Sequence, residues 1–122
     1  MELKEMLKGA VEGTGEVAES LMATVTGIVK EGTADTADIF GAIIDLGKEG
    51  VIDVTEGVKD VYIGAVNAVK ESGKSTEDAV SEVSVHAEKA VGNISEEGMD
   101  TVGGAAKKGI EEAKEILKKP LE

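Results

Sequence analysis

The chain contains no cysteine and no tryptophan, and only one proline, one phenylalanine and one tyrosine among its 122 residues. The lack of cysteine excludes disulfide bonds, thiolate zinc sites and thiol catalysis. Because large aromatic rings usually supply much of the buried area of a core, this core must be built from Val, Ile, Leu, Met and Ala. Such a core is thin, and it requires the backbones of neighbouring elements to approach closely.

Arginine is also absent, and the formal net charge at pH 7 is −12. Without guanidinium groups the chain has no bidentate clamp for phosphate or carboxylate. An acidic chain also lacks the basic face that nucleic acids require, and it is repelled by anionic lipid. We therefore expect no nucleic-acid partner.

Long apolar segments are missing as well. No stretch approaches the roughly 18 apolar residues of a membrane-spanning helix, and the first five residues lack the apolar centre of a signal peptide. The sequence therefore predicts a single domain over residues 1–122 in the cytoplasm, with peripheral association with a surface as a further option.

Valine recurs at intervals of eleven residues, at Val58, Val69, Val80, Val91 and Val102. Eleven residues make almost three turns of an α-helix, so these side chains fall on one line along a helix. Acidic residues, including Glu56 and Asp60, gather on the opposite side. The pattern predicts an all-α fold of long amphipathic helices with an eleven-residue repeat. A β-sheet is the weaker alternative, because the chain lacks hairpin-turn signals.

Helices are expected over residues 15–31, 34–72, 76–91 and 95–118. Gly73 is suited to end one helix, and Ser75 with Asp78 resembles a capping pair that begins the next. We expect bends near Gly73 and Gly92. Because the valine spacing continues through both glycines, it favours a long and nearly continuous helical track. The helices are predicted to pack as a hairpin, a slim bundle or a homo-oligomeric coiled coil.

Glycines border the apolar stripe, and three of them, Gly50, Gly57 and Gly64, are seven residues apart. Glycine in such a position lets two helix axes approach closely. Together with the valines, these glycines predict an interaction face for self-association or for packing against a partner. The predicted members of this face are Val51, Val54, Val58, Val61, Ala65, Val69, Val80, Val91, Val102, Gly50, Gly57 and Gly64.

The segment Lys48-Glu49-Gly50-Val51, with a poorer copy at residues 30–33, resembles the repeat core of the synucleins. The wider eleven-residue pattern is similar to that of group 3 late-embryogenesis-abundant proteins and exchangeable apolipoproteins. The resemblance implies helices that form on an apolar surface, on lipid or during drying.

Residues 68–75, Ala-Val-Lys-Glu-Ser-Gly-Lys-Ser, fit a relaxed phosphate-loop pattern with alanine in place of the first glycine. In such a loop Lys74 would contact phosphates and Ser75 would reach magnesium. The chain that follows is too short for a nucleotide-binding sheet. The sequence therefore favours a helix end followed by a cap, with nucleotide binding through residues 68–75 as a remote alternative.

Residues suited to catalysis or metal binding are scarce. His86 is the only histidine, and neither a Gly-x-Ser-x-Gly motif nor an EF-hand loop is present. We expect no catalytic, metal-binding or cofactor-binding residues, and hence a non-enzymatic structural or interaction protein whose partner is itself or a lipid or other apolar surface. The alternative is a chain that becomes helical on lipid, on an inclusion surface or during desiccation.

Overall fold

The computed structural model describes residues 3–12, 17–32, 34–96 and 100–118. These residues form the helices α1 (Leu3–Glu12), α2 (Val17–Glu31), α3 (Thr36–Lys48), α4 (Val54–Glu71), α5 (Thr76–Glu96) and α6 (Asp100–Lys118). No strand occurs within the described ranges, so the predicted all-α class is confirmed. None of the helices in these ranges combines the length and the apolar character needed to cross a lipid bilayer.

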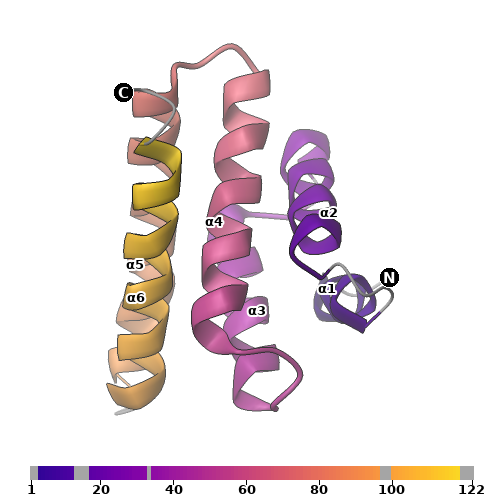
Figure 1. The fold of residues 1–122 in the computed structure, drawn as a ribbon, viewed down its shortest axis with the longest axis vertical. Coiled ribbons are helices and arrows are strands. Elements are labelled where there is room, and N and C mark those ends of the chain that lie inside the picture. Colours follow the sequence, from indigo (N-terminus) through magenta and orange to yellow (C-terminus); the bar gives the residue numbers. More distant parts are fainter. Residues whose placement is uncertain (1–2, 13–16, 33, 97–99, 119–122) are drawn as a thin grey trace.

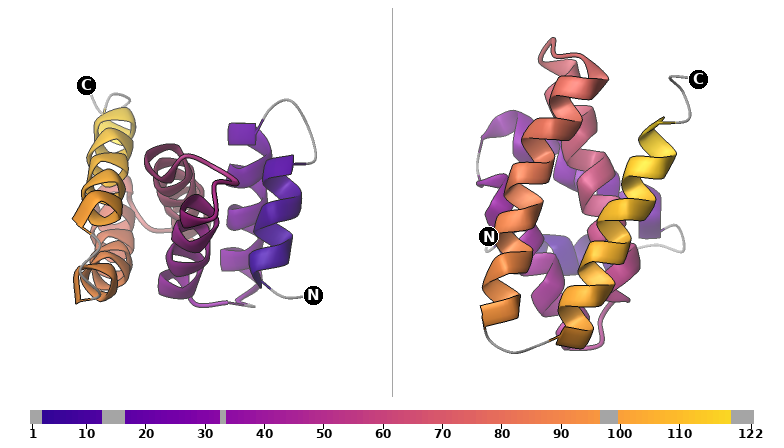
Figure 2. Two further views of the ribbon diagram at one scale, coloured as in Figure 1. Left: turned by 90° about the horizontal axis from the view of Figure 1, so that it is seen from below. Right: turned by 90° about the vertical axis from the view of Figure 1, so that its left-hand side faces the viewer.

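The helices are arranged in three layers of two, as Figure 1 and the left view of Figure 2 show. α1 and α2 form one outer layer, α5 and α6 form the other, and α3 and α4 lie between them. α4 contacts α2, α3, α5 and α6, and nearly every side chain from Gly57 to Val69 is buried. The centre of the core is therefore a single helix with neighbours in both outer layers.

The regularly spaced valines are divided among three helices. Val58 and Val69 of α4 and Val91 of α5 are buried, whereas Val80 of α5 and Val102 of α6 are partly buried. Three of the five therefore belong to the core and the other two pack against it, although the chain turns between α4 and α5.

The prediction of one helix over residues 34–72 is wrong, because the chain turns between α3 and α4. Gly50 adopts a left-handed φ of 82°, and the N–H of Val51 donates to the carbonyl oxygen of Leu46 at 2.9 Å, which closes α3. Asp53 then begins α4, because its carboxylate accepts a hydrogen bond from the N–H of Glu56 at 3.1 Å. The sequence prediction also missed α1.

The turn between α4 and α5 follows the sequence prediction more closely. Gly73 has a φ of 109° in the turn, and the hydroxyl of Ser75 accepts a hydrogen bond from the N–H of Asp78 at 3.1 Å. α5 continues as a helix through Gly92. The glycine at the turn thus supplies a backbone conformation that other residues rarely adopt.

Close helix crossings supply the contacts that large aromatic residues would otherwise make. At the crossing of α2 and α4, a Cβ atom on Gly64 would lie 2.8 Å from a backbone oxygen of α2, and the Thr26 hydroxyl donates to the Gly64 carbonyl oxygen at 2.9 Å. At the crossing of α4 and α6, Gly109 lies against α4, and the Thr55 hydroxyl donates to the Ala105 carbonyl oxygen at 3.0 Å. Both crossings thus combine a glycine with an interhelical threonine hydrogen bond.

The two aromatic residues of the chain meet in the core. The rings of Phe40 in α3 and Tyr62 in α4 are 6.3 Å apart between centroids, with an interplanar angle of 61°. Both side chains are at most 1% exposed. This edge-to-face pair joins the two helices of the middle layer.

Candidate functional site

Most residues of the predicted interaction face lie inside the bundle. One of them, Gly50, is exposed in the turn between α3 and α4. The partly buried members are Val51, Val54, Val80 and Val102. The buried members are Gly57, Val58, Val61, Gly64, Ala65, Val69 and Val91.

The buried members of this face contact other helices of the same chain. Gly64 lies against α2, and a Cβ atom on Gly57 would lie 2.9 Å from the side chain of Ile43 in α3. Val58 of α4 lies beside Gly109 of α6. The predicted face is therefore divided among several internal contacts, and only the exposed Gly50 and the partly buried members remain near the surface.

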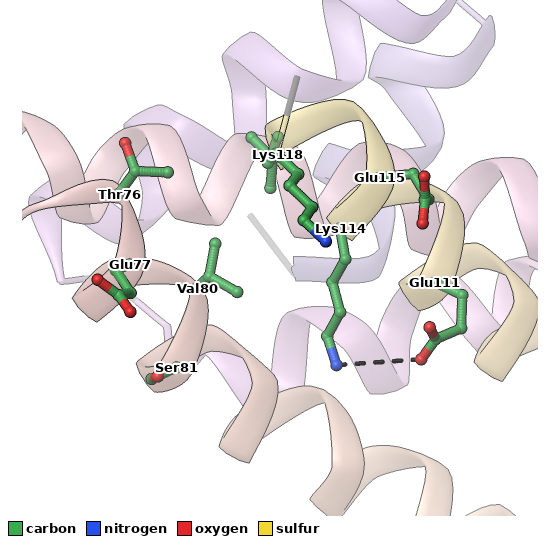
Figure 3. A pocket seen from close by; sticks show the side chains of 9 residues that line it. Thr76, Glu77, Val80, Ser81, Glu111, Lys114, Glu115 and Lys118 are labelled. Atoms are coloured by element: carbon green, nitrogen blue, oxygen red, sulfur yellow. Dashed lines mark ion pairs between the residues drawn. The ribbon is translucent and has the colours of Figure 1, made fainter. Parts of the chain in front are cut away.

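The outer side of the α5–α6 layer carries a groove, which we call the α5–α6 groove. It consists of two hollows of about 370 Å³ and about 470 Å³ that share Glu111 and Lys114. The first lies beside the start of α5 and the end of α6 (Figure 3), and the second beside the C-terminal half of α5. Hollows of this size are within the range of ligand and partner sites.

The α5–α6 groove has an apolar floor and differently charged borders. Its floor is made by Val80, Val91, Ile110 and Leu117, of which Val80 and Val91 belong to the predicted interaction face. Glu77 and Glu88 are the ionisable residues on the α5 side. The α6 side carries three lysines and two glutamates, namely Lys107, Lys114, Lys118, Glu111 and Glu115.

Several of these charges have no partner of opposite sign within the part of the chain that the structure describes. The Nζ atom of Lys114 lies 4.0 Å from Oε1 of Glu111, and Figure 3 draws this ion pair. Glu77, Glu88 and the lysines at 107 and 118 make no ion pair with any other described residue. The groove thus presents acidic and basic groups that are free to meet charges from outside.

Tyr62 fixes α5 from below the groove. Its hydroxyl lies 3.1 Å from the carbonyl oxygen of Val80, to which it donates, and 2.5 Å from Oγ of Ser84. Burial raises the pKa of Tyr62; the hydrogen bond with Ser84 lowers it in part, while the charges of Glu88 and Glu111 raise it further. The tyrosine therefore stays neutral and acts as a structural anchor for the floor of the groove.

Asp60 departs from the sequence prediction, which placed it on an exposed acidic side. It is 2% exposed, and its Oδ1 atom has no hydrogen-bond partner among the described residues. Burial raises its pKa to about 6, against the lowering effect of Lys59 and with a further increase from Glu56. The prediction failed because α4 is surrounded by other helices, so even its polar side is covered.

Residues 68–75 cover the end of α4, the turn and the start of α5. Ala68 and Val69 are buried in α4. The ammonium of Lys74 lies 2.7 Å from a carboxylate oxygen of Glu82, and the hydroxyl of Ser75 caps α5. Both side chains assigned to phosphate and magnesium by the phosphate-loop pattern therefore have structural partners within the chain. Nucleotide binding through this segment stays a prediction.

Metal-binding groups are not gathered in the described ranges. Within them, no three His, Asp or Glu side chains lie close enough to hold a metal ion. His86 lies near the exposed Asp35, with its Nδ1 atom 3.7 Å from a carboxylate oxygen. No protein-family description, curated protein or solved structure matches the chain.

Proposed function

We propose that the protein is a non-enzymatic interaction protein that associates with copies of itself. The α5–α6 groove is the observation that carries this proposal, because it is an open hollow with an apolar floor and charges that are unpaired in the described chain. Val80 and Val91 link the proposal to the predicted interaction face. The remaining valines of that face stabilise the bundle that presents the groove.

An exposed apolar side chain supports the same surface. Val85 of α5 is 65% exposed, which makes it one of two large hydrophobic side chains that are exposed in the described chain. It lies four residues after Ser81 and seven before Gly92, both of which line the groove, so it shares their side of the helix. A partner that covers the groove would remove Val85 from water.

The test is the mass of the protein in solution, measured by light scattering with small-angle X-ray scattering over a range of concentrations. We expect an oligomer that dissociates on dilution, and a monomeric mass at every concentration would contradict the proposal. Val85→Glu should weaken the oligomer. Ile116→Glu is the matched control, because Ile116 is 42% exposed and does not line the groove, so this variant should associate as the wild type does.

Asp60 supports a second candidate, a bundle that opens so that its helices bind lipid or another apolar surface. Asp60 shares one side of α4 with Gly57 and Gly64, three residues before it and four after it, and these two glycines lie against α3 and α2. We infer that its carboxyl group lies near the same helix crossings. A charged carboxylate buried there weakens the packing of α2 on α4.

Vesicle binding tests this second candidate. Zwitterionic and anionic vesicles should each be mixed with the protein, and binding followed by sedimentation, with amide hydrogen exchange to locate opened contacts. We expect binding to the zwitterionic vesicles, accompanied by faster exchange in α2 and α4. Failure to sediment with either kind of vesicle would exclude the candidate.

A further inference from the structure

Charges on the two sides of the α5–α6 groove have the same spacing. Glu77 and Glu88 are eleven residues apart on α5, and Lys107 and Lys118 are eleven residues apart on α6. Each pair therefore spans about 16 Å along its helix, since an α-helix rises 1.5 Å per residue. Two rows of equal length and opposite charge thus border one apolar floor.

The rows also lie at matching heights, because α5 and α6 run in opposite directions. Glu77 and Lys118 line the same hollow, and Glu88 and Lys107 line the other. Within one chain none of these four residues forms an ion pair with a described residue. Each glutamate therefore has a lysine at its own level, on the other side of the groove.

We infer that a second copy of this chain covers the groove, packed face to face about a two-fold axis parallel to α5 and α6. Rotation about such an axis leaves the position of every residue along the helix direction unchanged. It places α6 of the second copy opposite α5 of the first, and α5 of the second copy opposite α6 of the first. Glu77 of one copy then faces Lys118 of the other, and Glu88 faces Lys107. Symmetry repeats both pairs, and the two apolar floors meet between them.

The two glutamates of α6 that line the groove also fit this arrangement. Counting along the antiparallel helices from the pair of Glu77 and Lys118, Glu111 falls at the level of Ser84 and Glu115 at the level of Val80. Neither glutamate of α6 therefore faces a glutamate of the second copy. Any other partner would need a basic row that faces the glutamates of α5 and an acidic row that faces the lysines of α6, both with the same eleven-residue spacing. A second copy supplies both rows by symmetry.

This inference rests on the proposed self-association, and charge reversal tests it separately. One variant carries Glu77→Lys and Glu88→Lys, and the other carries Lys107→Glu and Lys118→Glu. In low salt, each variant alone should associate at least about tenfold more weakly than the wild type, because like charges then face each other. An equimolar mixture should form a heterodimer, because one variant then contributes two basic rows and the other two acidic rows.

Sedimentation velocity of each variant and of the mixture gives the result, and circular dichroism checks that both variants stay helical. Exposed positions outside the groove provide controls with the same changes in net charge. These are Glu19→Lys with Glu31→Lys, and Lys8→Glu with Lys70→Glu, and both should associate as the wild type does.

Three results would overturn the inference: wild-type association of either groove variant, a mixture that does not associate, or equal weakening in the control variants. If the wild type itself is monomeric at every concentration, the proposed self-association fails as well. If the wild type forms an oligomer and the groove variants form it equally well, the protein self-associates through a surface other than the α5–α6 groove. That result would overturn this inference but not the proposed self-association.

Discussion

Gly109 of α6 lies against the backbone of Thr55 in α4, so closely that a Cβ atom on residue 109 would lie 2.5 Å from the Thr55 carbonyl oxygen. The Thr55 hydroxyl crosses the same interface to the carbonyl oxygen of Ala105 at 3.0 Å. Contact between two backbones, rather than large side chains, therefore holds the α5–α6 layer on the central helix at this point.

Gly109→Ala should lower the free energy of unfolding by about 1–3 kcal/mol, because the helices must separate to admit the methyl group. Gly104 lies on the same helix and is exposed, and apart from the adjacent backbone of its own helix no atom of the described residues lies within 4 Å of the position of an added Cβ. Gly104→Ala should therefore stabilise the protein by about 0.5–1 kcal/mol, since alanine favours the helix. Urea unfolding of both variants measures the two effects, and equal changes would refute the close crossing.

Asp60→Asn should stabilise the protein at pH 7. The pKa of Asp60 is raised from 3.8 to about 6 in the folded protein, so between about pH 4 and about pH 6 the carboxyl group ionises in the unfolded chain but stays largely protonated in the folded one. The free energy of unfolding therefore falls progressively as pH rises through this window. Below this window both states are protonated, and the variant and the wild type should be similar. Above it the gain should be about 1–3 kcal/mol, the larger value corresponding to the full pKa difference at about 1.4 kcal/mol per unit.

The measurement for Asp60 is urea unfolding of both proteins at pH 4, 5, 6 and 7. A stability difference that grows from pH 4 to pH 6 and is then constant supports the buried, unpaired carboxylate. A difference that is the same at all four pH values would show that Asp60 is not the group that titrates in this window.

Tyr62→Phe should lower the free energy of unfolding by about 1 kcal/mol, because the variant loses the hydrogen bonds to Val80 and Ser84 but keeps the ring against Phe40. Ser84→Ala removes only one of these bonds and should cost less. A double-mutant cycle between the two positions, followed by thermal unfolding, should give a coupling energy that differs from zero. Full additivity would mean that the two hydroxyl groups do not interact.

The fold class can be predicted because helical periodicity is visible in the sequence. The residues at which each helix begins and ends can be predicted only in part. The sequence predicts the boundary at Gly73 with Ser75. It does not predict the equivalent boundary at Gly50, although Asp53 and Glu56 form a helix-start pattern of the same kind. The uninterrupted spacing of apolar residues hides the boundary at Gly50. A turn of suitable length lets the apolar residues of the next helix keep the same spacing and still point into the core.

The candidate site was harder to predict than the fold. Periodicity identifies which side of a helix is apolar, but it does not show how many neighbours that helix has, so the burial of Asp60 on the polar side of α4 could not be foreseen. The charge rows of the groove have a sequence signal in the paired spacing of Glu77 with Glu88 and of Lys107 with Lys118. That signal gains meaning only once α5 and α6 are known to lie side by side.

The position of α4 between the two outer layers has a consequence for how substitutions combine. Among the described residues, α1 and α2 make their main contacts with each other and with the middle layer. In the same way, α5 and α6 make their main contacts with each other and with the middle layer. Energetic effects in one outer layer should therefore add to those in the other, since separated sites without shared partners behave independently. Either surface could then change its sequence through evolution without compensation on the opposite side, while α4 would stay constrained by both.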